Sequence, residues 1–353
     1  MRILVGLSGG VDSAVAALLL QQAGHEVVGA TMSIWQKGNP FTGELKKNAC
    51  FGPNEAEDIA QAQRISEMLG IEYHVLDCAK EYEQIVLEDF RHEYKAGRTP
   101  NPCIWCNSLI KFGALPRIAA QKGIQFDRFA TGHYARVEKR GQRWGLLMGL
   151  DPKKDQSYFL YRLTQQQLSQ VMFPLGELKK EDVKHLALQV GLFAEETEES
   201  QDFYSGQYSD LLDVQPLEGN IEDAQGTVLG THNGYWNFTI GQRRGLKISS
   251  ALPLYVLRVD ASTNTVIVGT EEQTFAQSLV AEQLNWMFIE QPSGRYEVKA
   301  KIRSTGKPKA ALIDVQANKT VIVRFAEAQK AVTPGQSIVF YQDEAVLGGG
   351  VIQ

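Results

Sequence analysis

The amino-terminal segment joins a short apolar strand to a glycine-rich turn and then to a helix. The strand is predicted over 2–6, the turn reads SGGVDS over Ser8–Ser13, and the helix follows over 12–23. Adjacent glycines let a backbone turn tightly and approach a ligand closely, while a helix N-terminus offers N–H groups and partial positive charge. The segment therefore predicts a cradle for the phosphates of a nucleotide, although a ligand-free strand-to-helix turn would have the same outline.

The loop lacks the features of two common nucleotide motifs. No lysine follows the glycines, so this is not the Gly-x4-Gly-Lys-Ser/Thr loop that grips outer phosphates, and Gly-x-Gly-x2-Gly is absent. Strand and helix patterns alternate as far as residue 131, which predicts a parallel α/β sheet. In such sheets ligands bind beyond the carboxyl ends of the strands, where the glycine loop, Met32 and Gly132 would all lie.

Length and composition predict several folded units. The chain has 353 residues, of which 43% are hydrophobic, and short strands separated by turns replace the helical pattern after about residue 206. We expect an α/β domain over 1–205, a small β-rich domain over 206–275 and a β-barrel over 276–353. No apolar run reaches membrane-spanning length or suggests a signal peptide, so a cytoplasmic protein without membrane contact is expected. The net charge of −5 restricts any RNA binding to local basic patches.

The second strong local signal is the sequence GRTPNPCIWCN over 97–107. Its prolines predict a rigid, non-helical loop that projects Cys103 and Cys106 at the start of the next helix. A thiol near a helix N-terminus is expected to have a lowered pKa. By itself a Cys-x2-Cys pair is compatible with half a zinc site, a redox dithiol, iron–sulfur ligands or two ordinary buried cysteines.

Five motifs together resemble the tRNA-specific 2-thiouridylase family, within the ATP pyrophosphatase superfamily. They are SGGVDS at 8–13, TPNPCIWCN at 99–107, ATGHY at 130–134, KDQSYFL at 154–160 and TIGQRRGL at 239–246. The carboxyl end, with TPGQ at 333–336 and LGGGVI at 347–352, is also similar to that family, so the resemblance spans the whole chain. It implies an adenine nucleotide alpha hydrolase-like domain followed by two small β domains, the last a β-barrel.

The resemblance implies a sulfurtransferase that uses ATP and Mg²⁺ to replace the C2 oxygen of a tRNA wobble uridine with sulfur. The oxygen would be adenylated with release of pyrophosphate and would then leave as AMP. The sulfur would come from a donor protein such as a cysteine desulfurase or a sulfur-relay protein. By motif position the catalytic residues would be Cys106, Cys103 and Asp12. The ATP-binding residues would be Gly6, Leu7, Ser8, Gly9, Gly10, Val11, Asp12, Ser13, Met32 and Gly132. The residues in contact with tRNA would be Asn101, Pro102, Cys103, His133, Lys154, Asp155, Gln156, Arg303, Ser304 and Gln336.

The chain departs from many relatives where they carry a second catalytic cysteine. That position holds Tyr204, and a phenol cannot carry a persulfide. One interpretation is a four-iron–four-sulfur cluster held by Cys103, Cys106 and Cys50, with one iron open to bind sulfide and Asp202 as an alternative ligand. The other is that Cys103 and Cys106 themselves form a persulfide and resolving pair. Cys78 is expected in the hydrophobic core.

Two further functions remain open at the level of sequence. One is an ATP pyrophosphatase that acts on a small molecule, and the other is an RNA-binding protein whose catalysis is altered. The small-molecule enzyme has no need of two trailing β domains, and the intact glycine loop together with Cys106 argues against the second.

Overall fold

The N-terminal domain is built on a parallel sheet. The structure is a computed structural model that describes residues 1–36, 49–193, 202–204, 206, 208–290 and 292–353. The strand order is β4-β2-β1-β5-β8, and every pair in this sheet is parallel. The bounds are β1 (Arg2–Gly6), β2 (Glu26–Ser33), β4 (Glu72–Asp77), β5 (Arg128–Thr131) and β8 (Val171–Met172). The prediction of a parallel α/β sheet is confirmed.

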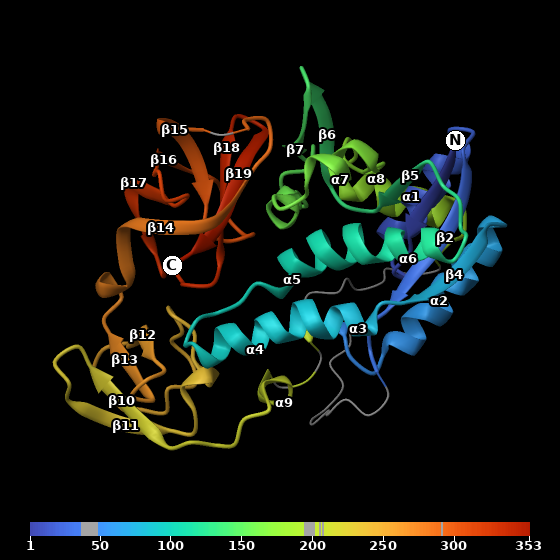
Figure 1. Ribbon diagram of the computed structural model, residues 1–353. Coiled ribbons are helices and arrows are strands. Elements are labelled where there is room, and N and C mark those ends of the chain that lie inside the picture. Colours follow the sequence, from blue (N-terminus) through green and yellow to red (C-terminus); the bar gives the residue numbers. More distant parts are fainter. Residues whose placement is uncertain (37–48, 194–201, 205, 207, 291) are drawn as a thin grey trace.

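Helices connect these strands and extend from the sheet toward the β domains (Figure 1). Those before β5 are α1 (Val11–Gln22), α2 (Glu55–Leu69), α3 (Ala79–Tyr82), η1 (Glu83–Leu87), α4 (Glu88–Lys95), α5 (Pro102–Trp105), η2 (Cys106–Ala114) and α6 (Leu115–Gln121). Those after it are η3 (Ser157–Leu160), α7 (Gln165–Gln170) and α8 (Lys180–Gln189).

The cysteine pair lies within a helix, which corrects the expectation of a non-helical loop. The helix begins at Pro102 rather than at Ser108, because proline is well suited to the first helical turn, where its missing N–H is not needed. From Cys106 to Ala114 the helix has π geometry. Because π segments are rare and occur often at functional sites, this geometry is consistent with a functional role for the segment.

Two short β elements of the N-terminal domain were not predicted. β3 (Ala49–Phe51) pairs in parallel with β9 (Asp202–Tyr204), and a hairpin is formed by β6 (Ala135–Arg140) and β7 (Arg143–Met148). The hairpin carries many charged residues, so its alternation is weak in the sequence. Through the pairing of Leu147 with Ala345 it joins the sheet of the C-terminal barrel to the N-terminal domain.

The central domain packs a small sheet over its own core. The order is β11-β10-β13-β12, with β10 (Gly219–Asp223), β11 (Val228–His232), β12 (Tyr255–Asp260) and β13 (Thr265–Gly269). The short helices α9 (Tyr208–Leu212), η4 (Tyr235–Asn237) and η5 (Glu272–Thr274) precede or flank these strands. Ile221, Val256, Val266 and Val268 are fully buried beneath the sheet.

The C-terminal strands close into a barrel in the order β14-β17-β16-β15-β18-β19, and β19 pairs back to β14. The bounds are β14 (Phe275–Trp286), β15 (Gly294–Lys301), β16 (Lys309–Val315), β17 (Val321–Lys330), β18 (Ser337–Gln342) and β19 (Ala345–Ile352). A Cβ on Gly350 would lie 2.6 Å from the Glu282 carbonyl oxygen, so this glycine permits the closing contact. The expected order of an α/β domain and two β domains, the last a barrel, is confirmed. Among the described helices, none is both long and apolar enough to cross a bilayer.

Candidate active site

The glycine loop is held in a fixed shape by its own polar groups. The Ser13 hydroxyl donates to the Gly10 carbonyl (3.0 Å) and accepts from the Ser8 N–H (3.2 Å). Gly9 has φ +79°, and a Cβ there would lie 2.7 Å from the Asp58 carbonyl oxygen. Only glycine tolerates both the positive φ and this close approach. The glycine at position 9 therefore permits the turn that leads to the N-terminus of α1.

The segments expected to converge on a nucleotide lie at one edge of the sheet. β1 is flanked by β2 and β5, and Gly6 is level with Ala30 on one side and Thr131 on the other. The Thr31 hydroxyl donates to the Leu7 carbonyl (2.8 Å). A Cβ on Gly132 would lie 2.6 Å from the Asp12 carbonyl carbon, so the residue after β5 touches the first turn of α1.

Asp12 has a cationic partner that the sequence did not reveal. Lys180, at the start of α8, donates from Nζ to Asp12 Oδ1 (2.7 Å), and the Tyr134 hydroxyl donates to the same oxygen (2.8 Å). Lys180 is 7% exposed, and its backbone N–H donates to Asp151 Oδ2 (3.1 Å). A buried ammonium thus stands at the glycine loop, although the loop itself contains no lysine.

His133 connects the glycine loop to the cysteine helix. Its Nδ1 lies 2.7 Å from the Thr131 hydroxyl, and its ring packs against Phe112 of η2 with centroids 5.6 Å apart. Burial, assisted by the charge of Lys111, holds the pKa of His133 well below its usual value. The lowered pKa favours the neutral imidazole.

Cys103 and Cys106 are both partly buried. Burial, together with the charges of Cys50 and Cys106, raises the pKa of the Cys103 thiol to about 12. Burial also raises the pKa of Cys106 to about 11, against the charge of Lys111, which lowers it. The expectation of lowered thiol pKa values is wrong for this structure, because desolvation outweighs the field of a helix N-terminus.

Cys50 lies on β3, next to the segment that carries Tyr204. It is exposed, and its charge raises the pKa values of Cys103 and Cys106, which places the three sulfurs within one another's electrostatic reach. Cys78 is fully buried, as expected, and burial raises its pKa to about 12. Of the two remaining cysteines, Cys50 is thus the exposed one, whereas Cys78 lies in the core.

Tyr204 belongs to an aromatic cluster in the core. It is 1% exposed, stacks on Trp35 (centroids 6.5 Å apart), packs on Phe51 (6.0 Å) and donates its hydroxyl to Asp210 Oδ2 (3.3 Å). Burial raises its pKa. The side chain at this position therefore fills space beneath β3, while Cys50 is the thiol carried by that part of the fold. The side chain of Asp202, the alternative ligand, lies outside the described residues.

Three of the residues expected to contact tRNA make hydrogen bonds within the N-terminal domain. Asp155 accepts from the N–H groups of Gly149 and Ser157 (both 3.1 Å), and Gln156 Oε1 accepts from the Tyr134 N–H (2.9 Å). The Lys154 N–H donates to the Asp151 carbonyl (3.1 Å). These contacts give the KDQSYFL segment a structural role that the sequence did not indicate.

The expected tRNA residues of the barrel lie near the chain that precedes Cys103. Arg303 is exposed and donates to the carbonyls of Lys330 (3.2 Å) and Ala331 (2.9 Å), while the adjacent Ser304 is partly buried. The amide nitrogen of Gln336 donates to the carbonyls of Thr99 (3.0 Å) and Pro100 (2.8 Å). The Asn101 side chain hydrogen-bonds the Tyr158 hydroxyl.

Within the described ranges, no group of three or more His, Cys, Asp or Glu side chains is arranged as a metal site. The donors available for iron are the thiols of Cys50, Cys103 and Cys106, whose type suits iron–sulfur ligation. For Mg²⁺ the glycine loop carries one carboxylate, Asp12, whose Oδ1 accepts from Tyr134 and Lys180. Since Mg²⁺ commonly binds through one or two carboxylates plus substrate phosphates, it would arrive with ATP.

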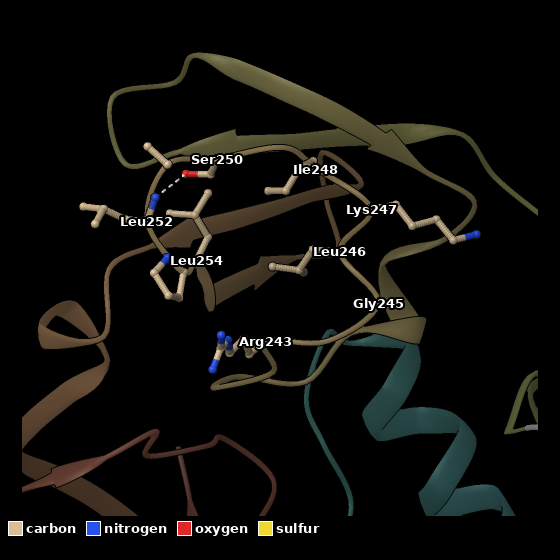
Figure 2. A pocket seen from close by; sticks show the side chains of 10 residues that line it. Arg243, Gly245, Leu246, Lys247, Ile248, Ser250, Leu252 and Leu254 are labelled. Carbon is tan, nitrogen blue, oxygen red and sulfur yellow. Dashed lines mark hydrogen bonds between the residues drawn. The ribbon is translucent and has the colours of Figure 1, made fainter.

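A cavity of about 360 Å³ lies in the central domain (Figure 2). The loop 243–254 lines it, with Arg243 and Lys247 beside leucines and an isoleucine. Figure 2 shows the Lys247 side chain pointing away from Leu252 and Leu254, which leaves Arg243 as the charged group nearer the leucines. The basic TIGQRRGL segment thus belongs to the central domain.

Comparison with known proteins places this geometry in a family. Residues 1–204 match the family described as the tRNA methyl transferase HUP domain, 211–270 the tRNA methyl transferase PRC-barrel domain, and 276–352 the aminomethyltransferase beta-barrel domain. A tRNA-specific 2-thiouridylase from Endomicrobium trichonymphae is 50% identical over 356 residues, which covers 100% of this chain and 99% of the relative. One from Geobacter metallireducens is 44% identical, covering 99% of this chain and 96% of the relative.

The class of protein is a nucleotide-binding α/β domain with a cysteine helix and two trailing β domains. The chain belongs to the tRNA-specific 2-thiouridylase family. The expected family is thereby confirmed.

Proposed function

We propose that this protein is an ATP-dependent tRNA sulfurtransferase that converts the wobble uridine to 2-thiouridine. The observation that carries the proposal is the continuous path from the glycine loop to the cysteine helix. Gly132 touches Asp12, and the adjacent His133 packs on Phe112 of the π-helical segment that Cys106 begins. A base adenylated at the loop would therefore lie within the same site as the thiols.

In the first step the uridine O2 attacks the α-phosphorus of ATP and pyrophosphate leaves. The glycine loop and the N–H groups of the first turn of α1 would hold the phosphates. Lys180 supplies the cation that the loop lacks, and on ATP binding its ammonium would be shared between Asp12 and the phosphates. Asp12 is also the carboxylate that would hold Mg²⁺ with the nucleotide, and the ion would neutralise charge on the phosphates.

In the second step sulfur attacks C2, the C2–O2 bond breaks, and the oxygen leaves with AMP. Adenylation is needed because the uridine oxygen by itself is a poor leaving group. Sulfide can make this exchange without any redox change. A persulfide on Cys106 would transfer its outer sulfur, leave a Cys103–Cys106 disulfide, and require a two-electron reductant before the next turnover. The target base has to leave the anticodon stack, so a flipped nucleotide is expected.

We propose that Cys50, Cys103 and Cys106 hold an iron–sulfur cluster in the active protein. The support is that Cys103 and Cys106 lie in one helix, that Cys50 is an exposed thiol on β3, and that residue 204 is withdrawn into the core. When bound, a four-iron cluster with three protein ligands supplies an iron open to sulfide. On ligation to iron the thiols would lose their protons. The free energy of metal binding would then offset the effect of burial, which raises the pKa values of Cys103 and Cys106.

The remaining expectations are part of the same proposal. The protein would act in the cytoplasm, where a reducing environment keeps its four free cysteines reduced, and would receive sulfur from a donor protein. Its units would be 1–205, 206–275 and 276–353. The residues expected to meet tRNA remain the ten given by motif position: Asn101, Pro102, Cys103, His133, Lys154, Asp155, Gln156, Arg303, Ser304 and Gln336.

The test is thiolation of an unmodified tRNA transcript by anaerobically purified protein with ATP, Mg²⁺ and sulfide. Nucleoside mass spectrometry should detect 2-thiouridine at the wobble position, and pyrophosphate release should require tRNA. The Cys106→Ala variant should lose thiolation but keep tRNA-dependent pyrophosphate release. Pyrophosphate release that ignores tRNA would indicate a small-molecule enzyme, and tRNA binding without either product would indicate an RNA-binding protein.

A further inference from the structure

The chain between α4 and α5, here called the strap (residues 96–101), leads directly into the cysteine helix. It begins where α4 ends in a Schellman motif: the Arg98 N–H donates to the Glu93 carbonyl (2.9 Å) and the Gly97 N–H to the Tyr94 carbonyl (3.0 Å). Gly97 has φ +74°, which glycine adopts without strain. Pro102 and Cys103 follow the strap directly, so any shift of the strap moves the thiols.

Both trailing β domains contact this short segment. From the central domain, the Tyr235 hydroxyl donates to the Lys95 carbonyl (2.7 Å) just before the strap, and a Cβ on Gly97 would lie 3.4 Å from the Val259 carbonyl oxygen. Figure 1 shows the turn between α4 and α5 at the junction of the central sheet with the barrel. The strap is therefore placed by parts of the chain far from it in sequence.

The barrel contributes the denser contacts, through the turn that leads into the first residue of β18 (residues 334–337, the barrel turn). The Thr99 N–H donates to the Pro334 carbonyl (2.9 Å), and Gln336 Nε2 donates to the carbonyls of Thr99 (3.0 Å) and Pro100 (2.8 Å). Gly335 has φ +89°, and a Cβ there would lie 2.7 Å from the Thr99 carbonyl oxygen. The two backbones thus meet as closely as a glycine allows.

The last strap residue is tied to the same turn. The Tyr158 hydroxyl donates to the Ser337 carbonyl (2.8 Å) and also hydrogen-bonds the Asn101 side chain. Tyr158 is 1% exposed, so this link is shielded from water. Thr99 and Pro100 are thus held through Gln336, and Asn101, at the N-cap position of α5, is held through Tyr158.

We infer that Gln336 is a positioning residue for the sulfur site, which holds the strap and thereby sets the direction of the helix that carries Cys103 and Cys106. Proline leaves Pro100 without an N–H, so the carbonyls are the groups by which its backbone can be held. One primary amide satisfies two successive carbonyls there, which fixes both peptide planes. The inference rests on the proposed function for the identity of the site, but the anchoring itself does not.

The consequence is that the barrel is a structural part of the active site as well as a surface for RNA. Displacement of the barrel by a bound tRNA would be transmitted to the cysteine helix through the barrel turn. The family pattern assigns Gln336 to tRNA contact, and the structure shows its amide nitrogen engaged with the strap. These two roles give different outcomes on substitution.

The test compares Gln336→Leu with Gln329→Leu. Leucine keeps similar bulk at 336 but removes both donors, whereas Gln329 lies on the same barrel and donates to the Glu327 carbonyl beside it (2.6 Å), away from the strap. For Gln336→Leu we expect a fall in the kcat of thiolation of roughly 10- to 100-fold, as a small misplacement of reacting groups produces. The Kd for tRNA and the KM for ATP should stay within about twofold of wild type.

A second readout needs no activity. Amide hydrogen exchange and the rate of iodoacetamide labelling at Cys103 and Cys106 should rise several-fold in Gln336→Leu, over 98–106 only, with no change in Gln329→Leu. A tRNA Kd weakened about tenfold with unchanged kcat and unchanged exchange would overturn the inference. Wild-type protein that fails to thiolate tRNA would refute the proposed function, while the exchange data would still decide whether Gln336 anchors the strap.

Discussion

Lys180, which is buried, and Asp12, which is partly exposed, form an ion pair with Nζ and Oδ1 2.7 Å apart, at the first turn of the helix that follows the glycine loop. The two residues are 168 positions apart in sequence. A loop whose sequence has no lysine thus acquires one from α8. Because α8 packs against α1, the pair also fixes the distance between the two helices.

We predict that Lys180→Met lowers the rate of tRNA-dependent pyrophosphate release about 100-fold, the size of effect produced by removing one group that stabilises developing charge. Steady-state kinetics with varied ATP would measure it. Lys179→Met removes the same charge from the adjacent exposed residue and should leave the rate within about twofold. Thermal unfolding of both variants separates loss of the cation from loss of folding. Unchanged pyrophosphate release in a folded Lys180→Met would show that the ammonium serves the helices alone.

Cys50→Ala should lower the iron content of anaerobically reconstituted protein to less than half of the wild-type value and lower thiolation with sulfide at least tenfold. The reason is that a cluster with two protein thiols is bound more weakly than one with three. Iron and sulfide analysis with the absorption spectrum would measure this. Cys78→Ala removes a thiol from the core and is the matched control, since it should retain iron. Iron-free wild-type protein with full activity would rule out the cluster and leave the Cys103–Cys106 pair as the sulfur carrier.

Tyr204→Cys should not create the second catalytic cysteine of the relatives. The tyrosine fills a closed aromatic cluster, so its removal leaves a cavity and should cost about 3 kcal/mol of unfolding free energy. Tyr204→Phe keeps the ring but removes the hydrogen bond to Asp210, and it should cost about 1 kcal/mol. Urea unfolding would measure both. A Tyr204→Cys protein of wild-type stability that thiolates faster would mean that position 204 reaches the site.

The raised pKa of Asp89 should make the stability of the protein depend on pH. Burial, followed by the charge of Glu93, raises the pKa of this α4 carboxyl to about 6. The folded state therefore holds a proton that the unfolded state has released, so the free energy of unfolding falls as the pH rises from about 4 to about 6 and stays lower above that.

Asp89→Asn should remove this fall and leave the variant about 1 kcal/mol more stable than wild type at pH 7.5, after allowance for partial exposure of the carboxyl. Urea unfolding at pH 4.5, 6 and 7.5 would measure the difference. Glu88→Gln, on the exposed neighbour, is the control and should run parallel to wild type. A constant difference between Asp89→Asn and wild type at all three pH values would contradict the raised pKa.

Local patterns predicted much of this protein. The turn at Ser8–Ser13 follows from glycines that alone tolerate its geometry, and the parallel sheet follows from alternating strand and helix signals. The early start of the cysteine helix was missed because two prolines were taken to exclude helix, although one of them occupies the first turn, where proline is favoured. The hairpin over 135–148 was missed because its charged residues obscure the alternation typical of strands.

Residue types at short spacing were enough to predict the loop shape, the class of fold, the order of the domains and the family. Tertiary packing brings distant groups together, namely Lys180 at Asp12 and Gln336 on the strap. It also decided the protonation of the thiols, since burial overrode the helix N-terminus. Such contacts depend on how helices and domains pack across more than a hundred residues, and desolvation depends on everything that surrounds a group, neither of which a local pattern records.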